Sequence, residues 1–195
     1  MMQPATYEKA KKIGTTILVQ MLPVMIGVYL GFAMNNFGER QKLEKQSNTY
    51  KEMLKNEIRE NLASVENVNS YHIQLTNKFS EILEAENMKE KFGSMQFRGF
   101  KPGFVNNSAY NTGIQTGIIQ EFDLKLIQSL NRLYTLQGKY NRFNENLINS
   151  YISNKFPETN SEIRSLLISS SMSMTDILIY EKELRSFYQE ILKAL

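Results

Sequence analysis

Apolar and polar positions divide the chain into an uncharged N-terminal stretch and a long remainder with helical periodicity. Residues 13–34 read IGTTILVQMLPVMIGVYLGFAM and carry no charged side chain. A helix rises about 1.5 Å per residue, so this stretch would reach about 33 Å, enough for a hydrocarbon core of about 30 Å. The pattern predicts a short basic tail at 1–12, a transmembrane helix at 13–35 and a helical domain at 36–195.

A cleaved signal peptide is the other interpretation of the same stretch. Three lysines precede it, and residues 31–33 (GFA) have the form of a small-x-small cleavage site. The apolar region of a signal peptide is typically about 7–15 residues long. The longer run in this chain favours a retained anchor in the lipid bilayer.

Positive charges flank the predicted span on both sides, so the charge bias for its orientation is weak. Lys9, Lys11 and Lys12 come before it, and positions 40, 42 and 45 after it are also basic. A short positive N-terminus ahead of a single span usually stays in the cytoplasm. We therefore expect the C-terminal domain on the exported side.

Small and polar residues form one stripe along the predicted span. Gln20, Gly27 and Gly31 share a helix face. Glycines at this spacing let another backbone approach closely, and a glutamine in lipid is costly unless a partner hydrogen-bonds to it. A chance pair of glycines is the alternative, because glycine is common in membrane helices. The stripe predicts contact with a protein partner or a second copy.

After the span, apolar residues recur at spacings of three and four. Between Glu39 and Phe92 the sequence contains neither proline nor glycine, which predicts one long, coiled-coil-like helix. Its apolar seam comprises Leu54, Ile58, Val65, Val68, His72, Leu75, Phe79 and Ile82. A single histidine on such a seam is either a packing residue with a hydrogen bond, or a pH switch or ligand-binding group.

The stretch GSMQFRGFKPGF at 93–104 interrupts the helical pattern with three glycines and a proline. Its phenylalanines either pack back on the helices or present a surface to a partner or to lipid headgroups. The candidate partner surface comprises Phe97, Arg98, Phe100, Lys101 and Phe104.

A short helix is predicted after this loop. Asn107 or Ser108 is a suitable N-terminal cap, and Gly113 or Gly117 a suitable end.

Two longer helices follow. Asp123 is expected to cap a helix that reaches about Asn154. Thr159 and Glu162 have capping-box spacing at the start of a last helix, which runs to the C-terminus with a possible interruption at 169–176. The predicted fold class is all-α, with the membrane helix continuing into an antiparallel three- or four-helix bundle.

Composition excludes most catalytic chemistries. The chain has no cysteine and a single histidine, which removes zinc-thiolate sites, cysteine nucleophiles and most catalytic triads. Its 23 basic and 20 acidic residues are mixed along the chain, unlike the basic stripe of a nucleic-acid-binding protein. No phosphate-binding loop or nucleophile elbow is present. We expect no enzyme activity, no cofactor, no metal and no nucleic-acid partner.

Three stretches follow one another along the chain: GFAMNNFGERQKLEK, YKEMLKNEIRENL and SAYNTGIQTGIIQEFDLKLIQSLNRLY. Their order resembles that in an uncharacterised family of small bacterial single-span membrane proteins with a C-terminal helical domain of unknown function. By this resemblance Asn36, Phe37, Glu39 and Arg40 correspond to a membrane-edge motif. A second, central motif corresponds to Ser108, Tyr110, Gly117, Leu130 and Tyr134. The resemblance implies a bacterial inner-membrane protein and no established activity.

Two functions fit these patterns. The first is a membrane-anchored interaction or structural subunit of a cell-envelope complex, without catalytic activity. The alternative is a ligand-sensing helical bundle that acts through a partner protein, since bundles bind small molecules between their helices.

Overall fold

The computed structural model describes residues 4–153 and 156–195, with side chains from residue 19 onward. Within these residues the chain is all-α and contains no strand, which confirms the predicted fold class. The elements are α1 (Pro4–Leu83), α2 (Met88–Ser94), α3 (Ser108–Thr116), the short 3-10 helix η1 (Ile118–Glu121), α4 (Leu124–Ser153) and α5 (Asn160–Ala194).

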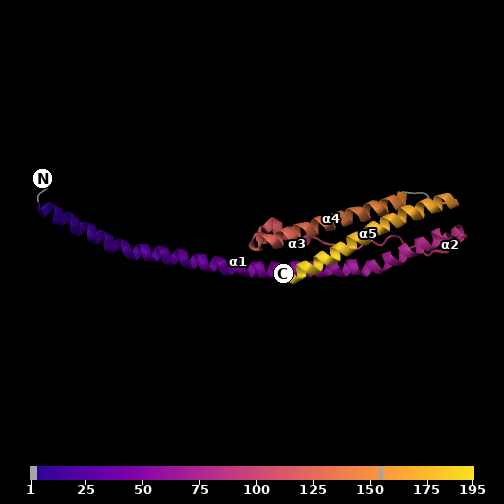
Figure 1. Ribbon diagram of the computed structural model, residues 1–195. Coiled ribbons are helices and arrows are strands. Elements are labelled where there is room, and N and C mark those ends of the chain that lie inside the picture. Colours follow the sequence, from indigo (N-terminus) through magenta and orange to yellow (C-terminus); the bar gives the residue numbers. More distant parts are fainter. Residues whose placement is uncertain (1–3, 154–155) are drawn as a thin grey trace. The chain divides into compact units, whose positions relative to one another are not determined.

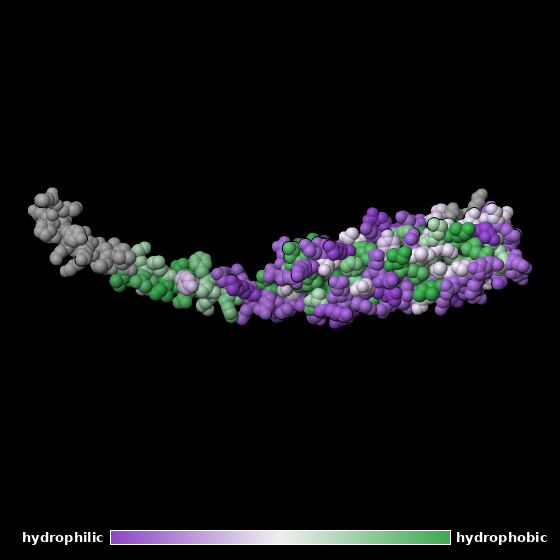
Figure 2. All heavy atoms as spheres, viewed as in Figure 1, coloured by the Kyte–Doolittle hydropathy of each residue, from purple (hydrophilic) through white to green (hydrophobic). Residues whose placement is uncertain are grey.

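The chain divides into two units, Met1–Asn48 and Thr49–Leu195, and α1 contributes to both. In the first unit, every side chain described from Val19 to Phe37 is exposed. Among the described residues, α1 is the one helix apolar enough over a sufficient length to cross a membrane, and its apolar window is not buried by other parts of the chain. Figure 2 shows this window as a green stretch that ends where hydrophilic side chains begin. The side chains of the predicted span before Val19 lie outside the described residues.

The second unit is a bundle of three long helices (Figure 1). The part of α1 after Asn48 runs in the same direction as α4, and α5 runs antiparallel to both. The non-helical segment 95–107, called the return loop below, leads from α2 back along the bundle to α3.

The predicted seam of α1 lies in the core of this bundle. All of its members are buried except Val68, which is half-buried. Leu54, Ile58 and Val65 are completely inaccessible to solvent. Burying an aliphatic side chain of this size stabilises a fold by about 1.5–3 kcal/mol, so the seam is a large part of what holds α1 to α4 and α5.

The predicted helix between Glu39 and Phe92 is not continuous, because α1 ends at Leu83. The amide of Ala85 bonds to the carbonyl of Ile82 at 3.2 Å, a tightening that ends the helix. The chain then turns into α2, where Met88 and Phe92 are buried. No glycine or proline ends this helix. Burial of Met88 and Phe92 stabilises the turn that follows it.

The other predicted helix ends are partly confirmed. Gly117 follows α3 with a φ of 75°, a left-handed conformation that glycine adopts without strain, whereas Gly113 lies inside the helix. Asp123 Oδ1 accepts hydrogen bonds from the amides of Lys125 and Leu126, as expected of a cap.

The last helix, α5, begins at the predicted capping box of Thr159 and Glu162. The interruption predicted at 169–176 is wrong, because α5 is continuous through this serine-rich segment. The hydroxyls of Ser169 and Thr175 donate to carbonyls of the preceding turn, so these two side chains are satisfied inside the helix.

Candidate functional site

Buried polar side chains lie in three successive layers between α1, α4 and α5. They are described below as the Glu57, Asn61 and His72 layers, after the residue that α1 contributes to each. Their buried members include Glu57, Asn61, Asn69, His72, Gln137 and Glu181. A buried polar group is costly unless it is hydrogen-bonded, so the partners in each layer decide what that layer does.

In the Glu57 layer, a carboxylate on α1 caps the N-terminus of α3. Glu57 Oε2 accepts hydrogen bonds from the amide of Ala109 at 2.6 Å and from the hydroxyl of Ser108 at 3.0 Å. A negative charge is stabilised there by the unpaired amides and the dipole of the helix. Asn107, the alternative cap from sequence, makes no side-chain capping bond. The cap thus comes from another helix instead of from the predicted neighbours of α3.

Tyr134 on α4 completes the Glu57 layer. Its hydroxyl donates to Glu57 Oε1 at 2.7 Å. Burial, together with the hydrogen bond and the negative charge of Glu57, raises the pKa of Tyr134 far above its usual value. The phenol therefore stays protonated and continues to donate. Its ring stacks on that of Tyr110, with the ring centroids 4.0 Å apart.

In the Asn61 layer, an asparagine side chain pairs with the backbone of the return loop. Asn61 Oδ1 accepts from the amide of Asn106 at 2.7 Å, and Asn61 Nδ2 donates to the carbonyl of the same residue at 2.7 Å. Gln137 Nε2 also donates to that carbonyl, at 2.6 Å, and Gln137 Oε1 accepts from the hydroxyl of Tyr188. This layer fixes the return loop to all three long helices.

In the His72 layer, the one histidine of the chain pairs with a carboxylate on α5. His72 Nδ1 lies 2.6 Å from Glu181 Oε1, and both side chains are 0 % exposed. His72 Nε2 lies 2.6 Å from the carbonyl oxygen of Phe100 and 3.2 Å from that of Lys101. Because carbonyl oxygens only accept, Nε2 carries a proton and donates to the return loop. A second proton lies between Nδ1 and Oε1.

The remaining hydrogen bonds of Glu181 are also internal. Asn69 Nδ2 donates to Oε2 at 2.7 Å, and the Tyr140 hydroxyl donates to Oε1 at 3.2 Å. Burial lowers the pKa of His72, but the hydrogen bond to Glu181, its negative charge and the two loop carbonyls together outweigh burial and raise that pKa. His72 is therefore a buried, hydrogen-bonded side chain whose partners all belong to its own chain.

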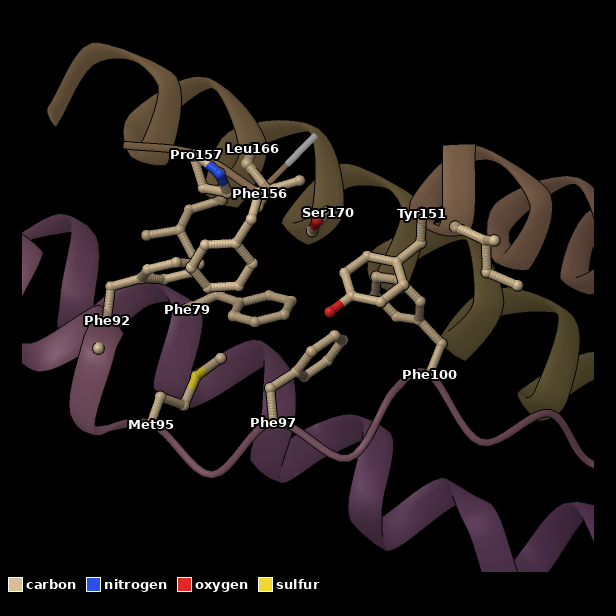
Figure 3. A pocket seen from close by; sticks show the side chains of 13 residues that line it. Phe79, Phe92, Met95, Phe97, Phe100, Tyr151, Phe156, Pro157, Leu166 and Ser170 are labelled. Atoms are coloured by element: carbon tan, nitrogen blue, oxygen red, sulfur yellow. The ribbon is translucent and has the colours of Figure 1, made fainter. Parts of the chain in front are cut away.

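An aromatic cavity of about 380 Å³ lies beyond the His72 layer (Figure 3). It is formed by α1, α2, the return loop, α4 and α5. Its aromatic walls are Phe79, Phe92, Phe97, Phe100, Tyr151 and Phe156. Aliphatic side chains and Ser170 complete the lining, and no charged side chain belongs to it among the described residues.

The five residues of the predicted partner surface do not share one face. Phe97 and Phe100 line the aromatic cavity. Phe104 points away and is 83 % exposed. Arg98 is exposed, and Lys101 Nζ lies 4.7 Å from the centroid of the Tyr71 ring. The prediction of one continuous surface made by all five residues is therefore wrong, because Phe97 and Phe100 pack inward.

The predicted packing face of the span is open. Gln20 is exposed, and a Cβ added at Gly27 or Gly31 would meet no atom within 4 Å. The membrane-edge residues Asn36, Phe37, Glu39 and Arg40 are also exposed. Asn35 Nδ2 donates to Glu39 Oε1 at 3.1 Å, one helical turn apart. The predicted contacts of both groups with a partner or lipid stay predictions.

Sequence patterns missed the polar layers and the aromatic cavity. The buried polar residues of α1 occupy seam-side positions, where polar residues such as Asn61 and Asn69 interrupt the apolar pattern. Their partners lie on other elements, so spacing along the chain does not reveal them.

Among the described residues, no cluster of three or more histidine, aspartate or glutamate side chains could hold a metal ion.

Over residues 4–153 and 156–195, the geometry defines an all-α protein with one candidate membrane span and a bundle with a hydrogen-bonded polar interior. No family model, curated protein or solved structure matches this chain. The resemblance to a family of small membrane proteins therefore stays a prediction.

Proposed function

We propose that this chain is a membrane-anchored, non-catalytic helical subunit of a cell-envelope complex in the bacterial inner membrane. The observation that carries the proposal is the run of exposed, mainly apolar and uncharged side chains from Val19 to Phe37. A soluble surface rarely exposes such a continuous apolar region, and hydrocarbon is an environment in which it is stable. The bundle then faces the periplasm, with a partner protein or a second copy of the chain held through the span.

The polar layers support a structural role for the bundle. The buried acidic and imidazole side chains of Glu57, His72 and Glu181 each make two or more hydrogen bonds within the chain. A general acid or base must be within reach of a substrate proton. Groups already bonded on both sides hold helices together and leave no free position for a substrate.

Photo-crosslinking from inside the span tests the proposed partner contact. A photoreactive residue at Val24, on the stripe of Gln20 and Gly27, should give a discrete cross-linked product in native membranes. The same residue at Leu22, on the opposite side of the helix, is the matched control and should give mainly lipid adducts. Equal protein cross-linking at both positions, or none at either, contradicts the proposal.

A second pair of variants tests the glycines. Gly31→Leu should abolish the Val24 product, because its side chain would hold a neighbouring backbone away. Ala33→Leu introduces the same leucine side chain off the stripe and should leave the product unchanged. A phosphatase that is active only in the periplasm, fused after Leu195, tests the orientation separately. An active fusion is expected, and a fusion that is expressed but inactive would place the C-terminus in the cytoplasm.

The second candidate function is a ligand-sensing bundle that acts through the same partner. The specific observation in its favour is the aromatic cavity, whose volume of about 380 Å³ falls within the range of roughly 300–1,000 Å³ typical of small-molecule sites. A sensor of this kind requires that occupancy of the cavity change the contact made by the span.

A further inference from the structure

We propose that the aromatic cavity is a binding site for a small, uncharged aromatic molecule that carries one hydrogen-bonding group. The inference rests on the second candidate function and names the ligand class of its site. It is independent of the proposed contact between spans, because none of the residues that line the cavity belongs to the first unit.

The part of the lining that the structure describes favours an uncharged ligand. Thirteen described residues line the cavity, and none of them has a charged side chain. An ion that enters such a site loses its hydration and gains no opposite charge in return. An uncharged molecule loses little and replaces water against apolar walls, which favours binding.

Two hydroxyls supply the polar contact. Ser170 is 6 % exposed, and its side chain makes no hydrogen bond to another described residue. The Tyr151 hydroxyl points toward the middle of the cavity (Figure 3) and has no partner among the described residues. A hydroxyl both donates and accepts, so either of the two can bind an N–H or O–H group of a ligand. A ligand with such a group would replace the water that reaches these hydroxyls from solvent.

The walls favour a flat ring over a flexible chain. The rings of Phe97, Phe100 and Tyr151 meet edge to face, with interplanar angles of 74° to 89° and centroids 5.1 to 5.5 Å apart. Such rings present both edges and faces to the cavity, and an aromatic ligand can continue this arrangement. An apolar cavity of about 150 Å³ is large enough for benzene, so a two-ring molecule is within the volume observed in this chain.

The cavity has an entrance at the end of the bundle. Ile152 and Phe156 line it and are 73 % and 71 % exposed, so solvent reaches the cavity beside them. The Phe156 ring lies 5.6 Å from that of Phe92 on the other side. A ligand can therefore enter without opening the packed core around Phe79 and Phe100.

Phe100 connects the cavity to the His72 layer. Its ring lines the cavity, and its carbonyl oxygen accepts the hydrogen bond from His72 Nε2 at 2.6 Å. We expect a ligand that packs on this ring to perturb the environment of the imidazole, because the same residue supplies the carbonyl that accepts from it. Because His72 is the one histidine in the sequence, its ¹⁵N signals report on occupancy without assignment of other residues.

The test is a titration of the full-length chain in lipid nanodiscs with indole, followed by the His72 ¹⁵N signals. Indole is flat, uncharged and carries one N–H group. We expect a saturable shift with indole and at least tenfold weaker binding of indole-3-carboxylate, whose charge the lining does not compensate. No saturable shift with indole, or equal binding of the carboxylate, overturns the proposal. The competitor is n-decanol, a flexible apolar chain. If n-decanol displaces indole at a concentration below that at which indole binds, the site prefers acyl chains and the proposal is overturned.

Two variants and a control locate the binding. Ser170→Leu fills the cavity and should abolish the shift, whereas Ser165→Leu makes the same change on an exposed position of α5 and should leave it unchanged. If Ser170→Leu does not fold, Tyr151→Phe removes a hydroxyl at almost constant volume and should weaken binding about threefold to tenfold. Unchanged binding in Tyr151→Phe contradicts the assigned polar contact. None of these outcomes alters the expected cross-linking at Val24, so the two proposals fail separately.

Discussion

His72 on α1 and Glu181 on α5 form a fully buried pair, with 2.6 Å between Nδ1 and Oε1. The pair is separated by 109 positions in sequence and is completed by Asn69, Tyr140 and the carbonyl of Phe100. The hydrogen bonds of a buried pair offset its loss of hydration, and removal of one member leaves the other uncompensated. The stability of the bundle should therefore respond sharply to changes at this position.

Glu181→Gln is expected to destabilise the bundle by about 3 kcal/mol or more, because His72 would lose the carboxylate that its second proton requires. Urea unfolding followed by circular dichroism measures the change in free energy. Glu183→Gln makes the same change on an exposed position of α5 and should fall within about 0.5 kcal/mol of the unchanged protein. Equal effects of the two variants would show that the buried pair contributes nothing.

The stabilising contribution of His72 should disappear at high pH. Its pKa in the folded protein lies above the unfolded value of about 6.5, so protonation favours the folded state. The contribution is complete below about pH 6.5 and is lost as the pH rises through the folded pKa. The neighbouring Tyr140 does not interfere, because burial raises its pKa well above its usual value.

The measurement for this prediction is the difference in urea midpoint between the unchanged protein and His72→Gln, recorded at intervals from pH 5 upward. The difference should be largest at the acidic end of this range and should shrink with increasing pH. A difference that grows with pH would mean that the imidazole is buried in its neutral form.

Removal of the inter-helix cap should loosen α3 before it loosens the rest of the bundle. Glu57→Ala leaves the amides of Ala109 and Tyr110 without their acceptor and the Tyr134 hydroxyl without its partner. We expect a loss of about 2 kcal/mol, at the upper end for a cap. Hydrogen exchange should accelerate first at Ala109 and Tyr110.

Glu60→Ala, on the exposed side of the same turn of α1, is the control for this experiment. It should leave exchange in α3 unchanged. If exchange in Glu57→Ala accelerated uniformly across the bundle and no more in α3 than elsewhere, the role of Glu57 as a cap would be contradicted.

Two glycines in helices should respond in opposite directions to alanine. A Cβ at Gly113 would overlap the hydroxyl and ring of Tyr50, which is itself buried, so Gly113→Ala should cost about 1–3 kcal/mol. A Cβ at Gly138 in α4 would meet no atom within 4 Å, so Gly138→Ala should stabilise the bundle by about 0.5–1 kcal/mol. Thermal unfolding measures both, and destabilisation by Gly138→Ala would contradict the open space at that position.

Several features of this fold could be predicted from the sequence because their causes are local. The Asp123 cap and the Thr159–Glu162 capping box each join residues no more than three positions apart. Gly117 ends α3 because its own backbone adopts a left-handed conformation. The seam from Leu54 to Ile82 follows the period of a helix, and its burial requires only that some partner cover one face.

The sequence by itself thus determined an all-α chain, its main helix starts, its apolar seam and a candidate span. Only the tertiary structure decided that α1 ends at Leu83, that α5 is uninterrupted, that Glu57 caps α3 and that His72 pairs with Glu181. It also decided that Phe97 and Phe100 line a cavity while Phe104 faces solvent. The physical reason is distance along the chain. Caps and periodic faces depend on neighbours within one or two turns, whereas buried hydrogen bonds and cavities depend on which distant side chains meet when helices pack.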